Sequence, residues 1–444
     1  MKHHLPKGSK KLLNAWAFYD WANSVYSLTI ASAIFPLFYG ALFRDAGIEK
    51  IEVFGGMIER APLITYVTSA AFLLVSIMTP ILSGIADYTG NKKIFLKIFC
   101  YLGSFSCIAL YWFSLEHIYI SLFTYFLGLI GFWGSLVFYN SYLPDIAFPE
   151  QQDGISAKGY SLGYIGSVLL LLLNLVMILK YEWFGFESAG APTRWSFILV
   201  GLWWAGFSQY SFYYLPKGND NKAKANASVL FKGFRELKKV WVGLGENLRL
   251  KRYLTAFFVY SMGVQTVMLA ASYFAEEELA WSSDDERTFG LIISILLIQI
   301  VAVAGAVLTS RLSRRFGNLM TLIFINFVWI GVCCYAYFVV TPVQFYGTAA
   351  VVGLVMGGIQ ALSRSTYSKF LPETKDTASY FSFYDVAEKI GIVIGMFLYG
   401  FIAQITGSMR NSIFFLGVIF LVGVLLLYMV PGRSVKKRMT EIKD

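Results

Sequence analysis

Apolar runs of about 20 residues follow one another along almost the whole chain, and this is the length that an α-helix needs to cross a lipid bilayer. The 444 residues are 57% hydrophobic and only 14% charged, whereas soluble domains are about 25% charged. A segment in lipid must satisfy its backbone hydrogen bonds internally, and these runs are too long for barrel strands. The sequence therefore predicts an all-α integral membrane protein.

Twelve transmembrane helices fit the pattern. The longest polar break, residues 216–251, divides them into two six-helix halves, residues 1–215 and 252–444. Within the break, apolar residues recur at helical spacing between basic ones, which predicts an amphipathic helix on an anionic membrane surface. A solvated linker is the alternative. The expected spans are 14–43, 60–86, 93–114, 117–140, 160–180, 195–215, 252–275, 288–310, 318–340, 343–366, 381–404 and 411–430.

The distribution of lysine and arginine predicts the orientation. The basic residues behind the net charge of +10 gather in the two tails and in alternate connections, as the positive-inside rule requires. We therefore expect no nucleic-acid partner. We expect the protein to lie in the inner membrane of the cell, with both termini on the cytoplasmic side. The basic residues assigned to the opposite side are Arg44, Lys50, Arg60, Lys180, Arg194, Arg287 and Arg410.

Two short segments each occur twice and indicate an internal duplication. The connection S83-G-I-A-D-Y-T-G-N-K-K93 joins the second and third predicted helices, and S310-R-L-S-R-R-F-G-N318 takes the same place in the second half. A second pair of similar segments has nearly the same separation along the sequence as the first pair. Its members are F148-P-E-Q-Q-D153 and L371-P-E-T-K-D376. Such pairs predict parallel halves related by an axis along the membrane normal.

Ionisable residues inside membrane helices are costly to bury, so each is a functional candidate. Asp20 lies about two turns inside the first helix, with Asn23 one turn further on the same face. Asp385 stands three and four residues before Glu388 and Lys389, so the three are neighbours on a helix. An ion pair that only sets packing is the alternative for this group. Further polar candidates are Tyr19, Asn140, Gln265 and Gln360.

Enzyme chemistry has little support in the sequence. G159-Y-S-L-G163 matches the nucleophile-elbow pattern, but that pattern needs a strand–turn–helix context and a histidine partner. Here it opens a membrane helix, and two of the three histidines lie in the amino-terminal tail. The four cysteines lie in apolar runs without metal-ligand spacing. We expect no enzyme activity, no cofactor and no metal site.

Several stretches together resemble the major facilitator superfamily, and within it the vacuole-effluxer-like proteins related to the fungal autophagy-associated amino-acid effluxer. The resemblance covers nearly the whole chain and implies a rocker-switch fold, a central path and export of a small polar solute such as an amino acid. Because burial disfavours a charged carboxylate, proton coupling is physically reasonable. The matching stretches are W16-A-F-Y-D-W-A-N-S24, F138-Y-N-S-Y-L-P-D-I-A147, G159-Y-S-L-G-Y-I-G166, G358-I-Q-A-L-S-R-S365 and the eleventh helix from Ser382.

The resemblance also implies roles for individual residues. In the superfamily, the aspartate equivalent to Asp87 braces the opposite half, often at the start of the eleventh helix. Asp20 would bind a substrate amine or a proton, and Lys389 would bind a carboxylate or hold Asp385. The expected cytoplasmic gate comprises Asp87, Gly90, Lys92, Lys93, Arg314 and Arg364. The substrate and coupling candidates are Tyr19, Asp20, Asn23, Asn140, Gln265, Gln360, Asp385, Glu388 and Lys389.

The seventh helix departs from the family pattern, which has an Asn-Asp pair before G-V-Q-T. Here Y260-S-M-G-V-Q-T266 has serine and methionine at those positions. Asp20, Asp385 and Glu388 therefore remain as the carboxylates that could couple transport. The departure also leaves a second hypothesis open, a transporter-like sensor that binds a solute without moving it. In either case we expect a monomer in the bilayer.

Overall fold

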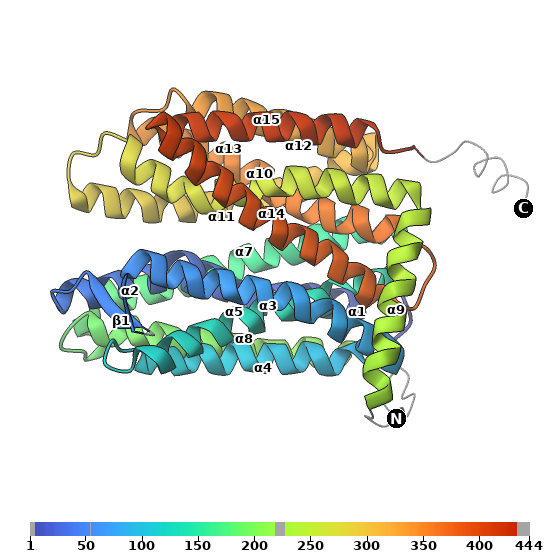
Figure 1. Ribbon diagram of the computed structural model, residues 1–444, viewed down its shortest axis with the longest axis horizontal. Coiled ribbons are helices and arrows are strands. Elements are labelled where there is room, and N and C mark those ends of the chain that lie inside the picture. Colours follow the sequence, from blue (N-terminus) through green and yellow to red (C-terminus); the bar gives the residue numbers. More distant parts are fainter. Residues whose placement is uncertain (1–4, 54, 218–226, 433–444) are drawn as a thin grey trace, which may run out of the picture.

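Two bundles of long helices lie side by side in the computed structural model (Figure 1), which describes residues 5–53, 55–217 and 227–432. The helices within residues 10–214 form one bundle, and those within residues 248–428 form the other. Buried residues gather in two large hydrophobic cores, one within each bundle. Apart from Ala378 in the first core and Tyr164 in the second, the first core comes from residues 12–215 and the second from residues 240–430.

The amino-terminal bundle begins with a span built from three consecutive helical segments. A π-helical segment, η1, interrupts the α-helix between α1 and α2, and a two-stranded antiparallel hairpin follows, with Lys50 opposite Glu59. The sequence predicted neither feature. The elements are α1 (Lys10–Val25), η1 (Tyr26–Ala33), α2 (Ile34–Asp45), β1 (Lys50–Val53), β2 (Gly56–Glu59), α3 (Arg60–Thr89), α4 (Lys92–Ala109), η2 (Leu110–Trp112), α5 (Ile118–Asn140), α6 (Leu143–Ile146), α7 (Pro149–Leu179), η3 (Tyr181–Phe184) and α8 (Gly190–Tyr214).

The second bundle repeats this plan with fewer interruptions. Among the described residues, eleven helical stretches are long and apolar enough to span a membrane. The helix α8 covers the remaining predicted span and packs along α1 and α4, which gives the predicted twelve-helix fold. The later elements are α9 (Ala227–Glu246), α10 (Leu248–Glu278), α11 (Asp284–Phe316), α12 (Asn318–Ala336), α13 (Pro342–Phe370), α14 (Thr377–Thr406) and α15 (Met409–Tyr428).

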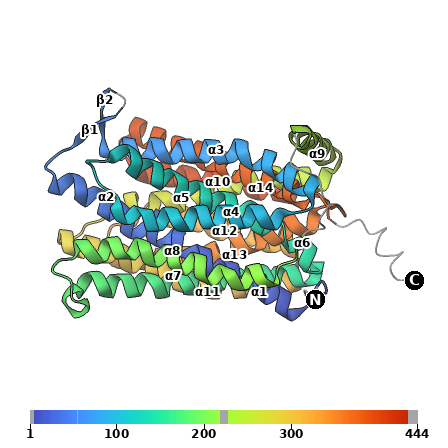
Figure 2. The ribbon, with the colours of Figure 1, turned by 90° about the horizontal axis from the view of Figure 1, so that it is seen from below.

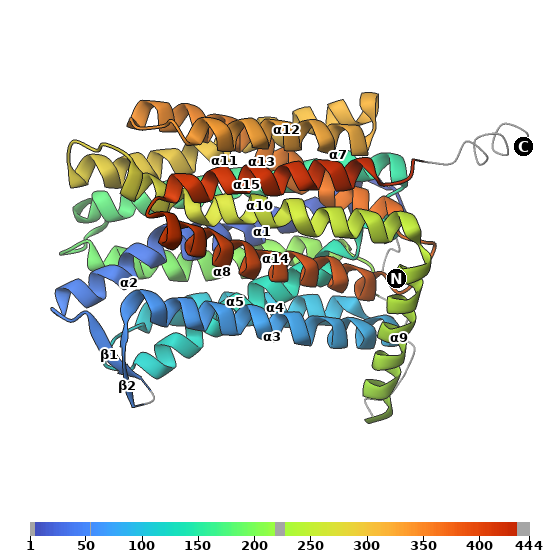
Figure 3. The same ribbon diagram turned by 45° about the horizontal axis from the view of Figure 1, so that its top comes forward.

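The two ends of the molecule differ. The helix α9 runs across one end, where α1 begins and α15 ends, and we call this the α9 end (Figures 1 and 3). The strands β1 and β2 project at the other, the hairpin end (Figure 2). The helix that the sequence predicted in the central break is therefore present. Its main packing partner is α3 of the amino-terminal bundle.

Glycines form the short connections at the α9 end. Gly90 ends α3 with a φ angle of 67°, and Gly317 follows α11 with a φ angle of 82°. Residues with a Cβ avoid this left-handed region, so glycine is the natural residue to end a helix there. Gly90 has a ψ angle of 18°, in the left-handed helical region, whereas Gly317 has a ψ angle of 159°, so the two duplicated connections turn differently while each joins two consecutive helices.

Other glycines let α11 and α13 approach until their backbones touch. A Cβ added to Gly353 or Gly357 would collide with the carbonyl oxygens of Ile298 and Ala302. One added to Gly305 would collide with the backbone of α13. Small residues permit such approach between membrane helices, where close packing drives association. Gly353 and Gly357 stand four residues apart, so they lie on the same face of α13.

A third duplicated feature, at the hairpin end, escaped the sequence comparison. Arg194 at the start of α8 donates hydrogen bonds of 2.7 Å to the carbonyl oxygens of Tyr111 and Phe113. Arg410 at the start of α15 donates equivalent bonds of 2.7 and 2.6 Å to carbonyls that follow α12. In each half, an arginine at the start of the last membrane helix therefore hydrogen-bonds to the chain at the end of the third membrane helix.

Candidate functional site

A buried ion pair joins the two halves. Arg364 on α13 lies with Nη2 3.1 Å from Oδ2 of Asp20 on α1, and their side chains are only 2% and 6% exposed. The hydroxyl of Tyr139 on α5 donates a 2.8 Å hydrogen bond to the same carboxylate oxygen. A charge that is this deeply buried is stable only with its partner in place.

The amino-terminal half surrounds the rest of the Arg364 guanidinium. Nε donates to Oγ of Ser156 at 3.0 Å, Nη2 to the Ser156 carbonyl oxygen at 3.0 Å, and Nη1 to Oδ1 of Asn140 at 3.2 Å. The rings of Trp16 and Tyr160 lie 4.7 and 4.2 Å from the guanidinium carbon, which favours a cation. The structure thus brings together Asp20, Asn140 and Arg364, which the sequence assigned to two separate sites.

The ion pair can form only because residue 159 is glycine and has no side chain. A Cβ added there would collide with Oδ2 of Asp20 and would lie 3.1 Å from Nη2 of Arg364. This glycine belongs to the stretch that matches the nucleophile elbow. The stretch is entirely helical within α7, and Ser161 has only a long contact of 3.5 Å to the Val303 carbonyl.

A polar stripe extends the contact between α7 and α13. Tyr164 donates a 2.7 Å hydrogen bond to Oε1 of Gln360, which lies one turn from Arg364 on α13. Ser156, Tyr160 and Tyr164 recur every fourth residue along the facing side of α7. Sequence reasoning passed over these three residues, although their helical spacing is a readable signal of a shared face.

A second charged cluster lies on α14. Lys389 forms an ion pair with Asp385 and lies 3.7 Å from Oε2 of Glu388. Gln265 on α10 donates a 2.8 Å hydrogen bond to Oε1 of Glu388. Among the described residues, Oδ2 of Asp385 has no hydrogen-bond partner.

The cluster on α14 also touches the amino-terminal half. The ring of Trp133 on α5 covers the Lys389 ammonium, with 4.1 Å between Nζ and the ring centroid. The Lys389 side chain is 1% exposed, whereas that of Glu388 is 19% exposed. The cluster thus offers charges of both signs where the two halves meet, and Glu388 is its most accessible member.

Tyr19 and Asn23 lie apart from both clusters. The Tyr19 ring packs inside the amino-terminal bundle, 4.9 Å from the Tyr139 ring and 6.2 Å from the Phe212 ring. Asn23 is also buried, and its Oδ1 accepts a 3.3 Å hydrogen bond from Ser24. Among the described residues, neither side chain forms a hydrogen bond or ring contact with the carboxyl-terminal half, which favours a role in packing α1 within its own bundle.

The gate residue Asp87 binds the start of α14. Its Oδ1 accepts a hydrogen bond of 3.2 Å from the backbone N–H of Ala378, and Oδ2 accepts one of 2.7 Å from that of Ser379. The first N–H groups of a helix lack intrahelical partners and carry a partial positive charge, so a carboxylate stabilises them. Asp87 therefore fastens the amino-terminal half to the first turn of α14.

The two gate lysines behave differently. Nζ of Lys92 donates to the Ser141 carbonyl oxygen at 2.9 Å and to Oγ1 of Thr377 at 2.8 Å, and it pairs with Asp145. Lys92 thus also reaches across to α14. Nζ of Lys93 donates to the Leu215 carbonyl oxygen at 2.5 Å, within the amino-terminal half.

The second copy of the gate connection meets α7. Asp153 near the start of α7 lies with Oδ1 2.9 Å from Nδ2 of Asn318, and with Oδ2 3.3 Å from Oγ of Ser313 and 2.5 Å from Nζ of Lys369. Nη2 of Arg314 lies against the same turn, 3.1 Å from where a Cβ on Gly154 would stand.

The duplicated segments therefore meet crosswise. The connection at residues 83–93 holds the helix that follows residues 371–376, and the connection at residues 310–318 holds the helix that contains Asp153. These contacts fasten the halves to each other at the α9 end. The ion pair between Asp20 and Arg364 adds a buried contact further inside the molecule.

Comparison with known proteins identifies the family. The family model described as vacuole effluxer Atg22 like matches residues 8–440. An MFS-type transporter of Bacillus subtilis, YxiO, is 30% identical over 95% of each chain. The autophagy-related protein 22-1 of Phaeosphaeria nodorum is 22% identical over 97% of this chain and 92% of its own.

Solved structures share the fold. The MFS transporter FucP in the outward conformation matches with a TM-score of 0.68 at 14% identity, covering 95% of this chain and 98% of its own. A bacterial homologue of the iron transporter ferroportin in an outward-facing state matches with a TM-score of 0.61 at 14% identity, over 95% and 97% of the two chains. The chain therefore belongs to the vacuole effluxer Atg22-like family of major facilitator superfamily transporters.

Proposed function

We propose that this transporter exports a small polar solute, such as an amino acid, across the inner membrane by alternating access coupled to protons. The observation that carries the proposal is the buried ion pair between Asp20 and Arg364, which joins the two halves that alternating access must separate. The family description as an effluxer favours export as the direction.

The orientation in the membrane follows from the basic residues. Lysines and arginines gather at the α9 end, which the positive-inside rule places in the cytoplasm. The crosswise contacts would then close the cytoplasmic side, and we take the conformation to be outward-facing for this proposal. The basic residues that carry the argument include Lys92, Lys93, Arg314, Arg315 and Lys369.

The cluster on α14 suits a solute that carries both charges. Glu388 is accessible and would bind an amine, while Lys389 would bind a carboxylate once Asp385 gives up its place. The indole of Trp133 and the amide of Gln265 would complete the site from α5 and α10. Polar groups in fixed positions beside an aromatic wall are typical of small-molecule sites.

Proton coupling would act through Asp20. A proton on Asp20 removes the negative charge that compensates Arg364, and leaving one member of a buried pair alone costs about 3–5 kcal/mol. A cost of that size moves a two-state equilibrium by two orders of magnitude or more, since about 1.4 kcal/mol is a factor of ten. Protonation would therefore weaken the link between α1 and α13 and favour opening to the cytoplasm.

Counterflow in proteoliposomes tests transport directly. A thermal-shift screen of amino acids, sugars and peptides first selects a stabilising solute, and vesicles loaded with that solute then receive a trace of labelled solute outside. We expect transient accumulation of label by the wild-type protein and at least a tenfold lower rate for Lys389→Ala, because the solute loses its charged partner. The exposed residue Lys158 supplies the matched control, Lys158→Ala, which should keep the wild-type rate.

The same experiment separates the two functions that the sequence left open. A sensor would show the thermal shift with the selected solute and no exchange of label in any variant. Binding without counterflow would therefore replace the transporter proposal with the sensor.

A further inference from the structure

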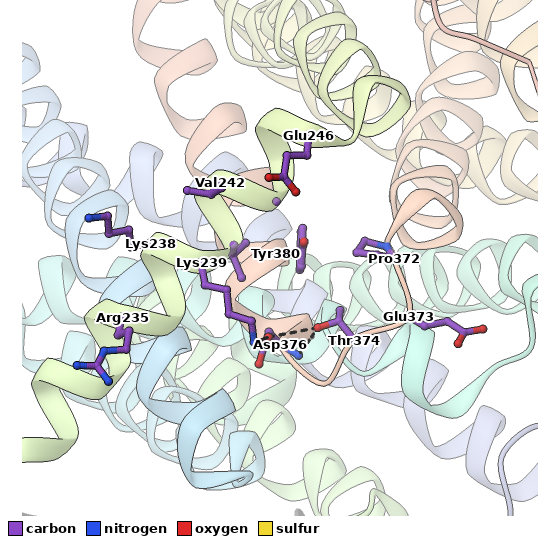
Figure 4. A pocket seen from close by; sticks show the side chains of 12 residues that line it. Arg235, Lys238, Lys239, Val242, Glu246, Pro372, Glu373, Thr374, Asp376 and Tyr380 are labelled. Carbon is purple, nitrogen blue, oxygen red and sulfur yellow. Dashed lines mark hydrogen bonds and ion pairs between the residues drawn. The ribbon is translucent and has the colours of Figure 1, made fainter.

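An open pocket of 640 Å³ lies at the α9 end, outside the path between the halves. The second half of α9 forms one wall, and residues 372–376 with Tyr380 at the start of α14 form the other (Figure 4). Neither the gate contacts nor the central clusters use this space.

The α9 wall of the pocket carries three basic residues and one acid, Glu246, and the other wall adds Glu373 and Asp376. Arg235, Lys238 and Lys239 line it and are all exposed. Lys239 lies with Nζ 3.2 Å from Oδ2 of Asp376 and 3.4 Å from Oε2 of Glu236. Arg235 and Lys238 form no ion pair with any described residue. Their charges remain available to an anion.

The same helix carries apolar side chains suited to a membrane surface. Trp241 is 64% exposed and Val242 is 51% exposed, and the Trp241 ring lies 5.5 Å from the ring of Phe383 on α14. A helix that combines basic residues with an exposed tryptophan lies in the interface between headgroups and acyl chains. Phospholipid headgroups are then the anions that reach the pocket at the highest local concentration.

The contacts of α9 also restrain the gate. The helix packs mainly on α3 of one half, yet Lys239 holds Asp376, the residue just before α14 of the other half. The next residues along the chain are Thr377, bound by Lys92, and Ala378 and Ser379, bound by Asp87. The first turn of α14 is thus held from α9 and from the gate connection together.

We propose that this pocket binds the phosphate headgroup of an anionic phospholipid, with Arg235 and Lys238 as its cationic partners. A bound phosphate competes with Asp376 for Lys239, because both are anionic acceptors of the same ammonium. Lipid binding then loosens α9 from the start of α14. Binding itself does not depend on the proposed transport, whereas the effect on the gate rests on alternating access.

Native mass spectrometry of the detergent-solubilised full chain tests the binding, with phosphatidylglycerol and phosphatidylcholine of equal chain length titrated separately. We expect preferential retention of phosphatidylglycerol and at least tenfold weaker retention by Arg235→Gln/Lys238→Gln. Each lost ion pair between a basic side chain and the bound phosphate should weaken retention several-fold, because charge-assisted hydrogen bonds are the strong ones. The matched control is Arg311→Gln/Arg315→Gln, which removes two exposed charges from α11 at the same end and should change retention less than twofold.

A third variant tests the competition. Asp376→Asn frees Lys239, so retention of phosphatidylglycerol should rise several-fold, an effect that mere structural damage would not produce. Equal retention of the two lipids, or equal losses in both double variants, would overturn the site. Glycerol phosphate that displaces the lipid at equal concentration would show that the pocket takes a soluble phosphate, and this would overturn the assignment to lipid.

Discussion

Transport should fall at least a hundredfold when Arg364 is replaced by glutamine. Glutamine cannot neutralise Asp20, so a buried carboxylate is left unpaired, at a cost of about 3–5 kcal/mol. The Ser156 and Asn140 oxygens also lose their donors. Uptake in proteoliposomes gives the transport rate, and the melting temperature in detergent gives the accompanying loss of stability.

A double variant separates lost function from lost folding. Asp20→Asn/Arg364→Gln leaves no unpaired charge, so its melting temperature should lie above that of Arg364→Gln, although pH-driven uptake stays absent because position 20 no longer carries a protonatable group. Effects of directly interacting residues are not additive, and the size of the departure measures their coupling. If the decreases in melting temperature caused by Asp20→Asn and by Arg364→Gln added up to the decrease in the double variant, the ion pair would have no energetic role.

Replacement of Asp87 by asparagine should shift the resting state towards opening at the α9 end. Asparagine keeps one acceptor oxygen but loses the charge that stabilises the first turn of α14. Hydrogen bonds to a charged group contribute about 1.5–3 kcal/mol, so losing part of this predicts roughly a tenfold change in the ratio of the two states. Single cysteines along the interface between α3 and α14 towards the hairpin end should therefore react more slowly with a membrane-impermeant reagent.

This labelling experiment needs a protein without reactive native cysteines and a control variant at the same end. Cys334 is exposed and needs replacement by serine, whereas the other three cysteines are buried. Glu150→Gln removes an exposed carboxylate near the start of α7 at the same end, so it should leave reactivity unchanged. Unaltered reactivity in Asp87→Asn would remove this residue from the gate.

Much of the fold could be predicted from the sequence, because membrane helices appear as long apolar runs. The length of the apolar runs and the repeated connections predicted twelve helices in two related halves, and both the structure and the family comparison confirm the fold and the family. Membership also confirms a transporter rather than an enzyme. The π-helical segment η1 and the hairpin of β1 and β2 were missed, because short local departures carry no comparable periodicity.

The candidate site could be predicted only in part from the sequence. The cost of burying charge singled out Asp20, and the family resemblance placed Arg364 at the gate, but nothing local indicates that residues 344 positions apart form one ion pair. The cluster of Asp385 and Lys389 was easier, since helical spacing alone makes them neighbours. The contribution of Trp133, Ser156 and Tyr160 depends on how the halves pack, which one sequence does not encode locally.

The central claim is that Asp20 couples protons to solute movement, and one comparison in proteoliposomes tests it. Uptake of the solute found by counterflow is measured with and without an imposed pH gradient, for the wild type and for Asp20→Asn. We predict that the gradient drives the wild type, whereas the variant, with a permanently neutral side chain, still exchanges solute but does not respond to pH. Transport by Asp20→Asn that remains fully pH-dependent would contradict the account.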